Sequence, residues 1–174
     1  MLSFINLCAI AFLLVLAYQD FKYRKIHWWL IPVLLVLFYI RNLWQTTINY
    51  LLESFVFNLS FVLIQLFLLV VYMSMKNKKL TNVVNSYIGL GDILFFVVMC
   101  MAFSFINFVF VYVIGLMLSL IITLAYRILK IEVSKEIPLA GILSFMLATL
   151  LLLNVSFPDL NFYNHEWIKK WILL

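Results

Sequence analysis

Two of the seven acidic residues in this 174-residue chain stand beside long apolar runs. Asp92 follows Gly89-Leu90-Gly91 and opens such a run, whereas Asp20 closes the first apolar run of the chain. A carboxylate next to hydrocarbon is costly and normally faces the interior of a helix bundle or a wet cavity, so it is a candidate functional group. The other five acids fall at helix ends or in polar segments, where we interpret them as solvated charges: Glu53, Glu132, Glu136, Asp159 and Glu166.

The two glycines before Asp92 bear on its surroundings. Gly89 and Gly91 are two of only four glycines in the chain. Glycine permits positive φ and lets a backbone approach another helix or an extended peptide closely. We therefore expect Gly89 and Gly91 to shape a substrate-binding site beside Asp92. The alternative interpretation is an ordinary helix start with the aspartate near its N-cap.

A pair of carboxyl groups can activate water. Two such groups close together in a low-dielectric site do not both ionise easily, so they share a proton and titrate as a unit. The ionised member takes a proton from a water that attacks an amide carbonyl, while the protonated member donates toward the carbonyl oxygen. If the fold joins Asp20 and Asp92, the predicted chemistry is aspartic proteolysis with both as catalytic residues. For Asp20 alone, the alternative is an interfacial acid balanced by Lys22 and Arg24.

The composition predicts that these aspartates belong to a membrane protein. The chain is 67% hydrophobic and 11% charged, with a mean hydropathy of +1.16, far from the roughly 45–50% apolar share of a soluble domain. We expect an all-α helical bundle forming one membrane-embedded domain over residues 1–174. The net charge of +5 comes from basic residues that flank apolar runs, which indicates orientation in a lipid bilayer and not nucleic-acid binding.

The apolar runs predict six transmembrane helices. A helix needs about 20 apolar residues to cross about 30 Å of hydrocarbon, and runs of suitable length cover about 2–19, 28–44, 51–73 and 138–155. The fifth run, 92–126, would make a helix of roughly 50 Å, too long for one modestly tilted crossing. We expect this run to break near Ser104 and Asn107 and to form two helices.

The basic residues predict the orientation of these helices, because Lys and Arg accumulate in cytoplasmic loops. Nine of the twelve follow the first, third and fifth runs, and the intervening connections hold only Arg41. This alternation predicts a multi-pass protein of the cytoplasmic membrane with its N terminus outside, and it places Asp20 and Asp92 together at the cytoplasmic face. The segment 157–174 mixes aromatic and basic residues, which is typical of an interfacial amphipathic tail.

The sequence predicts neither a metal nor another cofactor. Cys8 and Cys100 lie inside apolar runs, where a free thiol acts as a small hydrophobic group. His27 and His165 are far apart and lie next to aromatic or acidic residues typical of a membrane interface. The chain has no clustered His, Cys and acidic ligands.

Three segments resemble a known family. Gly89-Leu90-Gly91-Asp92 resembles the GxGD motif of membrane aspartic proteases, and Asp20-Phe-Lys-Tyr-Arg-Lys-Ile26 resembles the first-aspartate segment of the type IV prepilin peptidases. Ile137-Pro138-Leu139-Ala140-Gly141 is similar to the proline-containing start of that family's last helix. The resemblance covers about residues 10–150. It implies a peptidase that removes the short basic leader from prepilin-like precursors of the type IV pilus class, cutting on the cytoplasmic side just before the precursor's hydrophobic helix.

The chain departs from the family pattern at several positions. His27 and Trp28 stand where the family usually has Pro and Asn, and Leu94 replaces a lysine often found two residues after the second aspartate. The cysteine-bearing insertion associated with N-methylation is missing, which implies a peptidase-only form. The alternatives are a presenilin-like intramembrane protease, or a small transporter or assembly scaffold in which the aspartates relay ions or pair helices.

Overall fold

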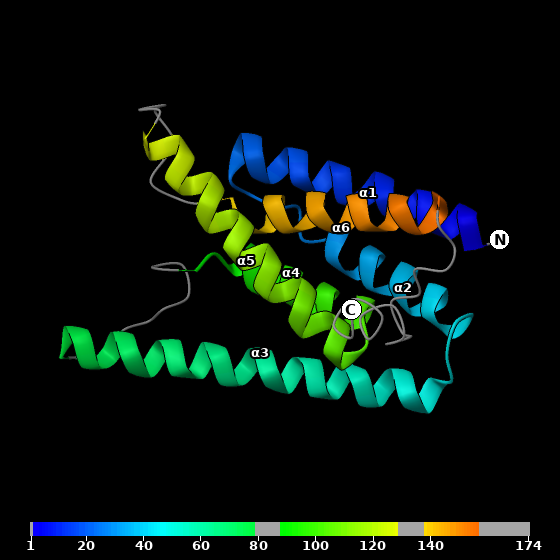
Figure 1. The fold of residues 1–174 in the computed structure, drawn as a ribbon, viewed down its shortest axis with the longest axis horizontal. Coiled ribbons are helices and arrows are strands. Elements are labelled where there is room, and N and C mark those ends of the chain that lie inside the picture. The colour runs from blue at the N-terminus through cyan, green and yellow to red at the C-terminus, as the bar shows by residue number, and fades with distance from the viewer. Residues whose placement is uncertain (1, 79–87, 129–137, 157–174) are drawn as a thin grey trace, which may run out of the picture.

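Six α-helices make up the part of the chain described by the computed structural model, residues 2–78, 88–128 and 138–156 (Figure 1). The prediction of an all-α fold is confirmed for these residues. The predicted interfacial tail, 157–174, lies outside the described residues. The helices are α1 (Leu2–Tyr23), α2 (Leu30–Leu43), α3 (Ile48–Asn77), α4 (Leu90–Ala102), α5 (Phe105–Ile128) and α6 (Leu139–Ser156).

Four of these helices are long and apolar enough to cross a membrane: α1, α3, α5 and α6. The other two, α2 and α4, are apolar but contain 14 and 13 residues, which corresponds to a length of about 20 Å each. The lengths and apolar composition of the helices therefore indicate a membrane protein. Six crossings stay a prediction.

The long apolar run breaks between α4 and α5, as expected, at Phe103 and Ser104. Asn107 does not belong to the break, because it lies in the first turn of α5. Phe103, Ser104 and Asn107 are all fully buried. Ser104 therefore lies in a turn that is packed inside the bundle and is not exposed at the surface.

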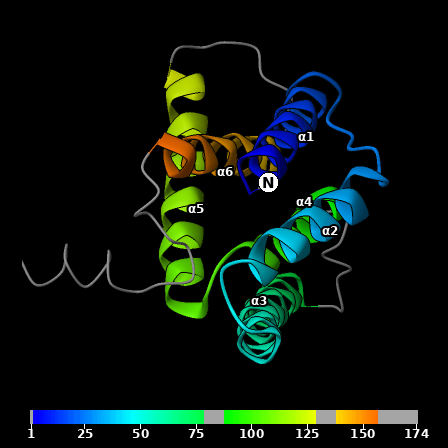
Figure 2. The same cartoon turned by 90° about the vertical axis from the view of Figure 1, so that its right-hand side faces the viewer.

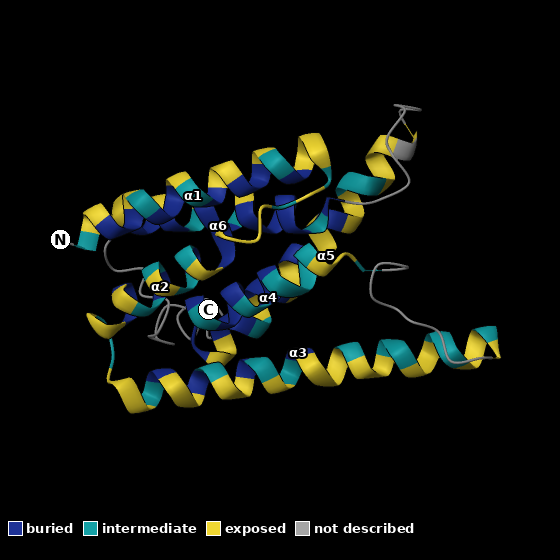
Figure 3. Cartoon of the chain, turned by 180° about the vertical axis from the view of Figure 1, so that it is seen from behind, coloured by how far each residue is buried: buried dark blue, intermediate teal, exposed yellow. Residues whose placement is uncertain are grey.

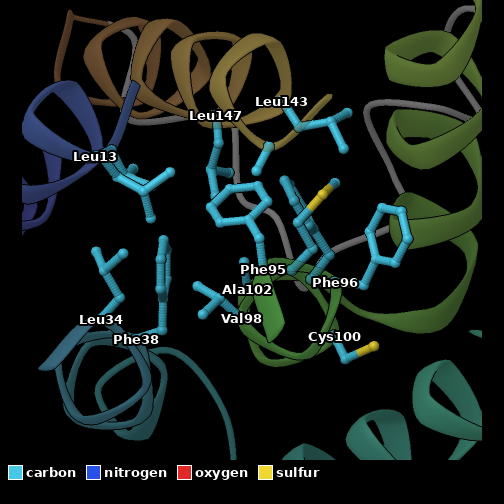
Figure 4. Close-up of a cluster of buried hydrophobic side chains, with 14 of the residues drawn as sticks. Leu13, Leu34, Phe38, Phe95, Phe96, Val98, Cys100, Ala102, Leu143 and Leu147 are labelled. Atoms are coloured by element: carbon cyan, nitrogen blue, oxygen red, sulfur yellow. The ribbon is translucent and has the colours of Figure 1, made fainter. Parts of the chain in front are cut away.

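The first and last helices make the most extensive helix–helix contact in the described part of the chain. Figures 1 and 2 show α1 and α6 side by side, and two hydrogen bonds at opposite ends make them antiparallel: Asp20 with Gly141, and Asn6 with Asn154. Helix α2 packs on α1 and α4, while α3 packs on α4 and α5. Buried side chains from α1, α2, α4 and α6 converge between these layers (Figure 4) and include Leu13, Leu34, Phe38, Phe95, Val98 and Leu147.

Much of the outer surface is apolar. Helix α3 is buried along a narrow strip only and exposes most of its length (Figure 3). Phe67, Leu68, Tyr72 and Met75 on its C-terminal half are each at least 60% exposed. Apolar side chains on the outside of a helical bundle are the expected contact with lipid.

A buried cation holds three helices together at the end of the bundle away from Asp20. Arg41 lies in the last turn of α2 and is fully buried, so the expectation that it sits in a connecting loop is wrong. Its Nε donates to Asn6 Oδ1 of α1 at 2.8 Å, its Nη2 to Asn154 Oδ1 of α6 at 3.2 Å, and its Nη1 to Asn42 Oδ1 at 3.0 Å. These hydrogen bonds allow the guanidinium to remain inside the fold, because a buried charge without partners is very costly.

Asn42 and one further asparagine, Asn58, cap the C-terminal end of α4. Asn42 Nδ2 donates to the carbonyl of Met101 at 2.6 Å, and Asn58 Nδ2 donates to those of Cys100 and Phe103 at 2.9 and 2.8 Å. The last carbonyls of a helix have no partner within it. Side chains from α2 and α3 therefore satisfy the backbone at the buried turn that separates α4 from α5.

Candidate active site

Asp20 and Asp92 come together at the N-terminal end of α6. Asp20 Oδ2 accepts a hydrogen bond from the backbone N–H of Gly141 at 2.6 Å, and Asp92 Oδ1 accepts one from the backbone N–H of Ala140 at 2.8 Å. The donors are consecutive residues of one helix. The two carboxyl groups are thus adjacent, although they come from the end of α1 and the start of α4.

The start of α6 explains why these amides are available. The first N–H groups of a helix have no acceptor within it, and the helix dipole favours negative charge at this end. Pro138 stands just before α6, and its carbonyl accepts the N–H of Ile142 at 3.1 Å. The two backbone N–H groups that precede that of Ile142, those of Ala140 and Gly141, donate to the aspartates instead. Each carboxyl group uses one oxygen in this way and keeps a second oxygen for other partners.

The two aspartates differ in exposure. The Asp20 side chain is buried, with 7% of its surface exposed, whereas Asp92 is half-buried. Gly89, just before α4, is exposed. Asp92 is therefore the more accessible of the two aspartates.

The glycines before Asp92 act by close approach and not by positive φ. Gly89 has an extended backbone, with φ −65° and ψ 142°, and no glycine in the described part of the chain has positive φ. A Cβ at Gly89 would lie 3.1 Å from Asp92 Oδ2, and one at Gly91 would lie 3.0 Å from Ile26 Cδ1. Both glycines therefore lie close to their neighbours, Gly89 to Asp92 and Gly91 to Ile26, without using the positive φ that glycine permits.

Gly141 is a site residue that sequence reasoning did not single out. A Cβ at position 141 would lie 2.9 Å from Asp20 Oδ2 and 3.2 Å from Asp20 Cβ. Only glycine lets α6 approach the first aspartate this closely. The signal in the sequence was a rare glycine three positions after a proline.

The segment between α1 and α2 is fixed by Gln19. Gln19 Oε1 accepts the backbone N–H of His27 at 3.1 Å and lies 2.9 Å from His27 Nδ1. A proline at this position, as in the prepilin peptidases that the sequence resembles, has no N–H to donate. With histidine at this position, the backbone N–H is present and binds Gln19, the residue before Asp20. This contact ties the segment to α1.

The aspartate pair is not part of a larger cluster of metal-binding side chains in the described part of the chain. The two aspartates are paired, but residues 2–78, 88–128 and 138–156 contain no group of three His, Cys, Asp or Glu side chains that could bind a metal. Cys8 and Cys100 are free thiols outside the site, and Cys100 is buried in the core.

The described helices define the class as an α-helical membrane protein with two aspartates paired at a helix N-terminus. No family model, no curated protein and no solved structure matches this chain. The geometry of the aspartate pair is therefore the basis for assigning a function.

Proposed function

We propose that this protein is a membrane aspartic endopeptidase of the prepilin-peptidase type. Its substrates are prepilin-like precursors that carry a short basic leader before a hydrophobic helix. The observation that carries the proposal is the attachment of Asp20 and Asp92 to the consecutive amides of Gly141 and Ala140. This arrangement holds two carboxyl groups side by side at a helix end, where a peptide and a water molecule have access.

The reaction uses one aspartate ionised and the other protonated. The ionised carboxylate takes a proton from water as the water oxygen attacks the amide carbon, and the carbonyl oxygen receives the proton of the second carboxyl group. When the C–N bond breaks, the amine nitrogen takes up the proton gained from water. The gem-diol returns its hydroxyl proton to the second aspartate. One water molecule is consumed, and the pair regains its single shared proton.

The membrane topology that suits this reaction has six crossings, with the N terminus outside and the site at the cytoplasmic face of the cytoplasmic membrane. Asp20 at the C-terminal end of α1 and Asp92 at the N-terminal end of α4 then lie at one surface. A leader that ends just before a hydrophobic helix brings its scissile bond to the same depth. The hydrophobic helix of the precursor stays in the bilayer, beside the apolar outer surface of the protein.

Co-expression with a prepilin-like precursor tests the proposal. The wild-type protein is expected to shorten the precursor by its leader, and Asp20→Asn and Asp92→Asn are each expected to prevent this while the protein still accumulates in the membrane. Glu53→Gln provides the matched control, because Glu53 is an exposed acid near the other end of the bundle. Cleavage should be unaffected by this change.

Other outcomes would point to a different function. Normal trimming by either aspartate variant would refute the role of the pair. A scaffold would keep its binding partner after both substitutions and trim nothing. A transporter would lose ion or solute flux with Asp20→Asn without ever shortening a peptide.

A further inference from the structure

Arg24 occupies an unusual backbone position beside the aspartate pair. Helix α1 ends at Tyr23, and Arg24 follows with φ 55°, in the left-handed region. Its backbone N–H still donates to the carbonyl of Asp20 at 3.1 Å. Residues with a Cβ seldom adopt this conformation, and when they do so near a functional site, the strain is an observation from which a role can be inferred.

One nitrogen of the Arg24 side chain is buried without a partner. Nη1 makes no hydrogen bond among the residues that the structure describes, so it donates to neither carboxylate. Arg24 lies one helical turn after Asp20, to which its backbone is hydrogen-bonded, and its positive charge favours the ionised form of both Asp20 and Asp92.

A buried N–H without an acceptor costs free energy, so its retention calls for a ligand that supplies one. An anionic ligand fits poorly here, because Asp20 and Asp92 repel it. A peptide carbonyl is neutral when it binds, and its oxygen gains negative charge as water attacks, before the protonated aspartate has delivered its proton. Donors aimed at such a developing charge stabilise the transition state more than the bound substrate.

We propose that Arg24 Nη1 donates a hydrogen bond to the carbonyl oxygen of the scissile peptide bond and stabilises the partial negative charge that builds up there until the protonated aspartate delivers its proton. This makes Arg24 a third catalytic residue, and the inference rests on the proposed peptidase function.

The test separates the backbone of Arg24 from its side chain. Arg24→Gly removes the guanidinium but suits a left-handed backbone, so the melting temperature in detergent should not fall. We expect kcat for precursor cleavage to fall about 100-fold with KM little changed, as for the loss of one oxyanion donor. Arg24→Lys, which keeps a positive donor, should recover part of the rate.

Lys78 offers a matched control. It is the only other non-glycine residue with positive φ in the described part of the chain, with φ 52° at the C-cap of α3. Lys78→Gly makes the same backbone change and removes one positive charge, and it should leave kcat unchanged. A fall in kcat for Arg24→Gly but not for Lys78→Gly would show that the loss of rate comes from the position of Arg24 beside the aspartates and not from the backbone change or the lost charge.

Three results would overturn the inference. The first is an Arg24→Gly variant that cleaves at the wild-type rate. The second is a variant that loses stability and activity together and is not improved by lysine, because that indicates a structural role. The third is a wild-type protein that does not trim any precursor, a result that refutes the peptidase function itself and is seen without any Arg24 variant.

Discussion

Asp20 and Gly141, which are 121 positions apart in the chain, are joined by a hydrogen bond of 2.6 Å between the carboxylate and the backbone amide. The same glycine leaves room for the carboxylate, because a Cβ at position 141 would lie 2.9 Å from Asp20 Oδ2. Gly141 therefore donates a hydrogen bond to Asp20 and, because it has no side chain, also leaves the space that the carboxylate occupies. This double role makes position 141 a sensitive probe of the site.

Gly141→Ala is expected to displace the Asp20 carboxylate. A shift of about 1 Å in a reacting group can lower a rate by about 100-fold, so kcat should fall by one to two orders of magnitude while the protein remains folded. Gly115→Ala is the comparison, since its Cβ would overlap Leu143 Cδ2 at the contact of α5 with α6 and not touch an aspartate. The Gly115→Ala variant should have a lower melting temperature, while the kcat of the protein that remains folded should stay close to that of the wild type. Unchanged kcat in Gly141→Ala would contradict the proposed role of this hydrogen bond.

The rate of precursor cleavage should depend on pH as a bell-shaped curve. A pair that shares one proton is inactive when both carboxyl groups are protonated and again when both are ionised. The measurement is kcat/KM over a pH series in proteoliposomes, with the melting temperature recorded at each pH to separate titration from unfolding. A rate that stays constant across both limbs would argue against a shared proton.

The asparagine ligands of Arg41 are expected to determine stability and not catalysis. Asn6→Ala removes the acceptor of Arg41 Nε and leaves a buried charged donor unsatisfied, a loss of about 1–3 kcal/mol in the free energy of unfolding. Asn49→Ala is the control, because Asn49 is exposed on α3 and such surface changes are usually within about 0.5 kcal/mol. Unfolding in detergent micelles measures both. Equal stability of the two variants would show that the buried network contributes nothing.

Chelators should leave cleavage unchanged. The proposed reaction uses side chains of the protein and no metal ion, and no group of three metal-binding side chains occurs in the ranges 2–78, 88–128 and 138–156. Precursor trimming by purified protein is measured before and after treatment with EDTA. Activity that disappears and then returns with one divalent metal would require a different mechanism.

Hydropathy predicted the helices well, because length and apolarity directly determine whether a segment can cross a bilayer. The run 92–126 was too long for one crossing, so a break was expected near Ser104 and Asn107, and the structure has it at Phe103 and Ser104, with Asn107 inside α5. The pairing of Asp20 with Asp92 could be anticipated from the distribution of Lys and Arg, which assigned both residues to one end of the bundle.

The partners of the aspartates could not be predicted in the same way. Gly141 and Ala140 act through backbone amides, which carry no side-chain signal, and their use depends on how α6 packs against α1. Arg41 was misplaced because a charge next to an apolar run normally lies in water, whereas here three asparagines from three helices make its burial possible. The extended backbone of Gly89 shows that glycine can be required for space alone.

The short helices α2 and α4, of 14 and 13 residues, pack against each other beside the much longer α3 of 30 residues. If α2 and α4 both cross the membrane, their length of about 20 Å is less than the roughly 30 Å of the hydrocarbon layer, and local thinning of the lipid would relieve this hydrophobic mismatch. Thinned lipid beside these two helices would bring headgroups and water closer to Asp92. For the proposed peptidase, a thicker bilayer would then be expected to slow cleavage, because it would move the reacting bond away from water.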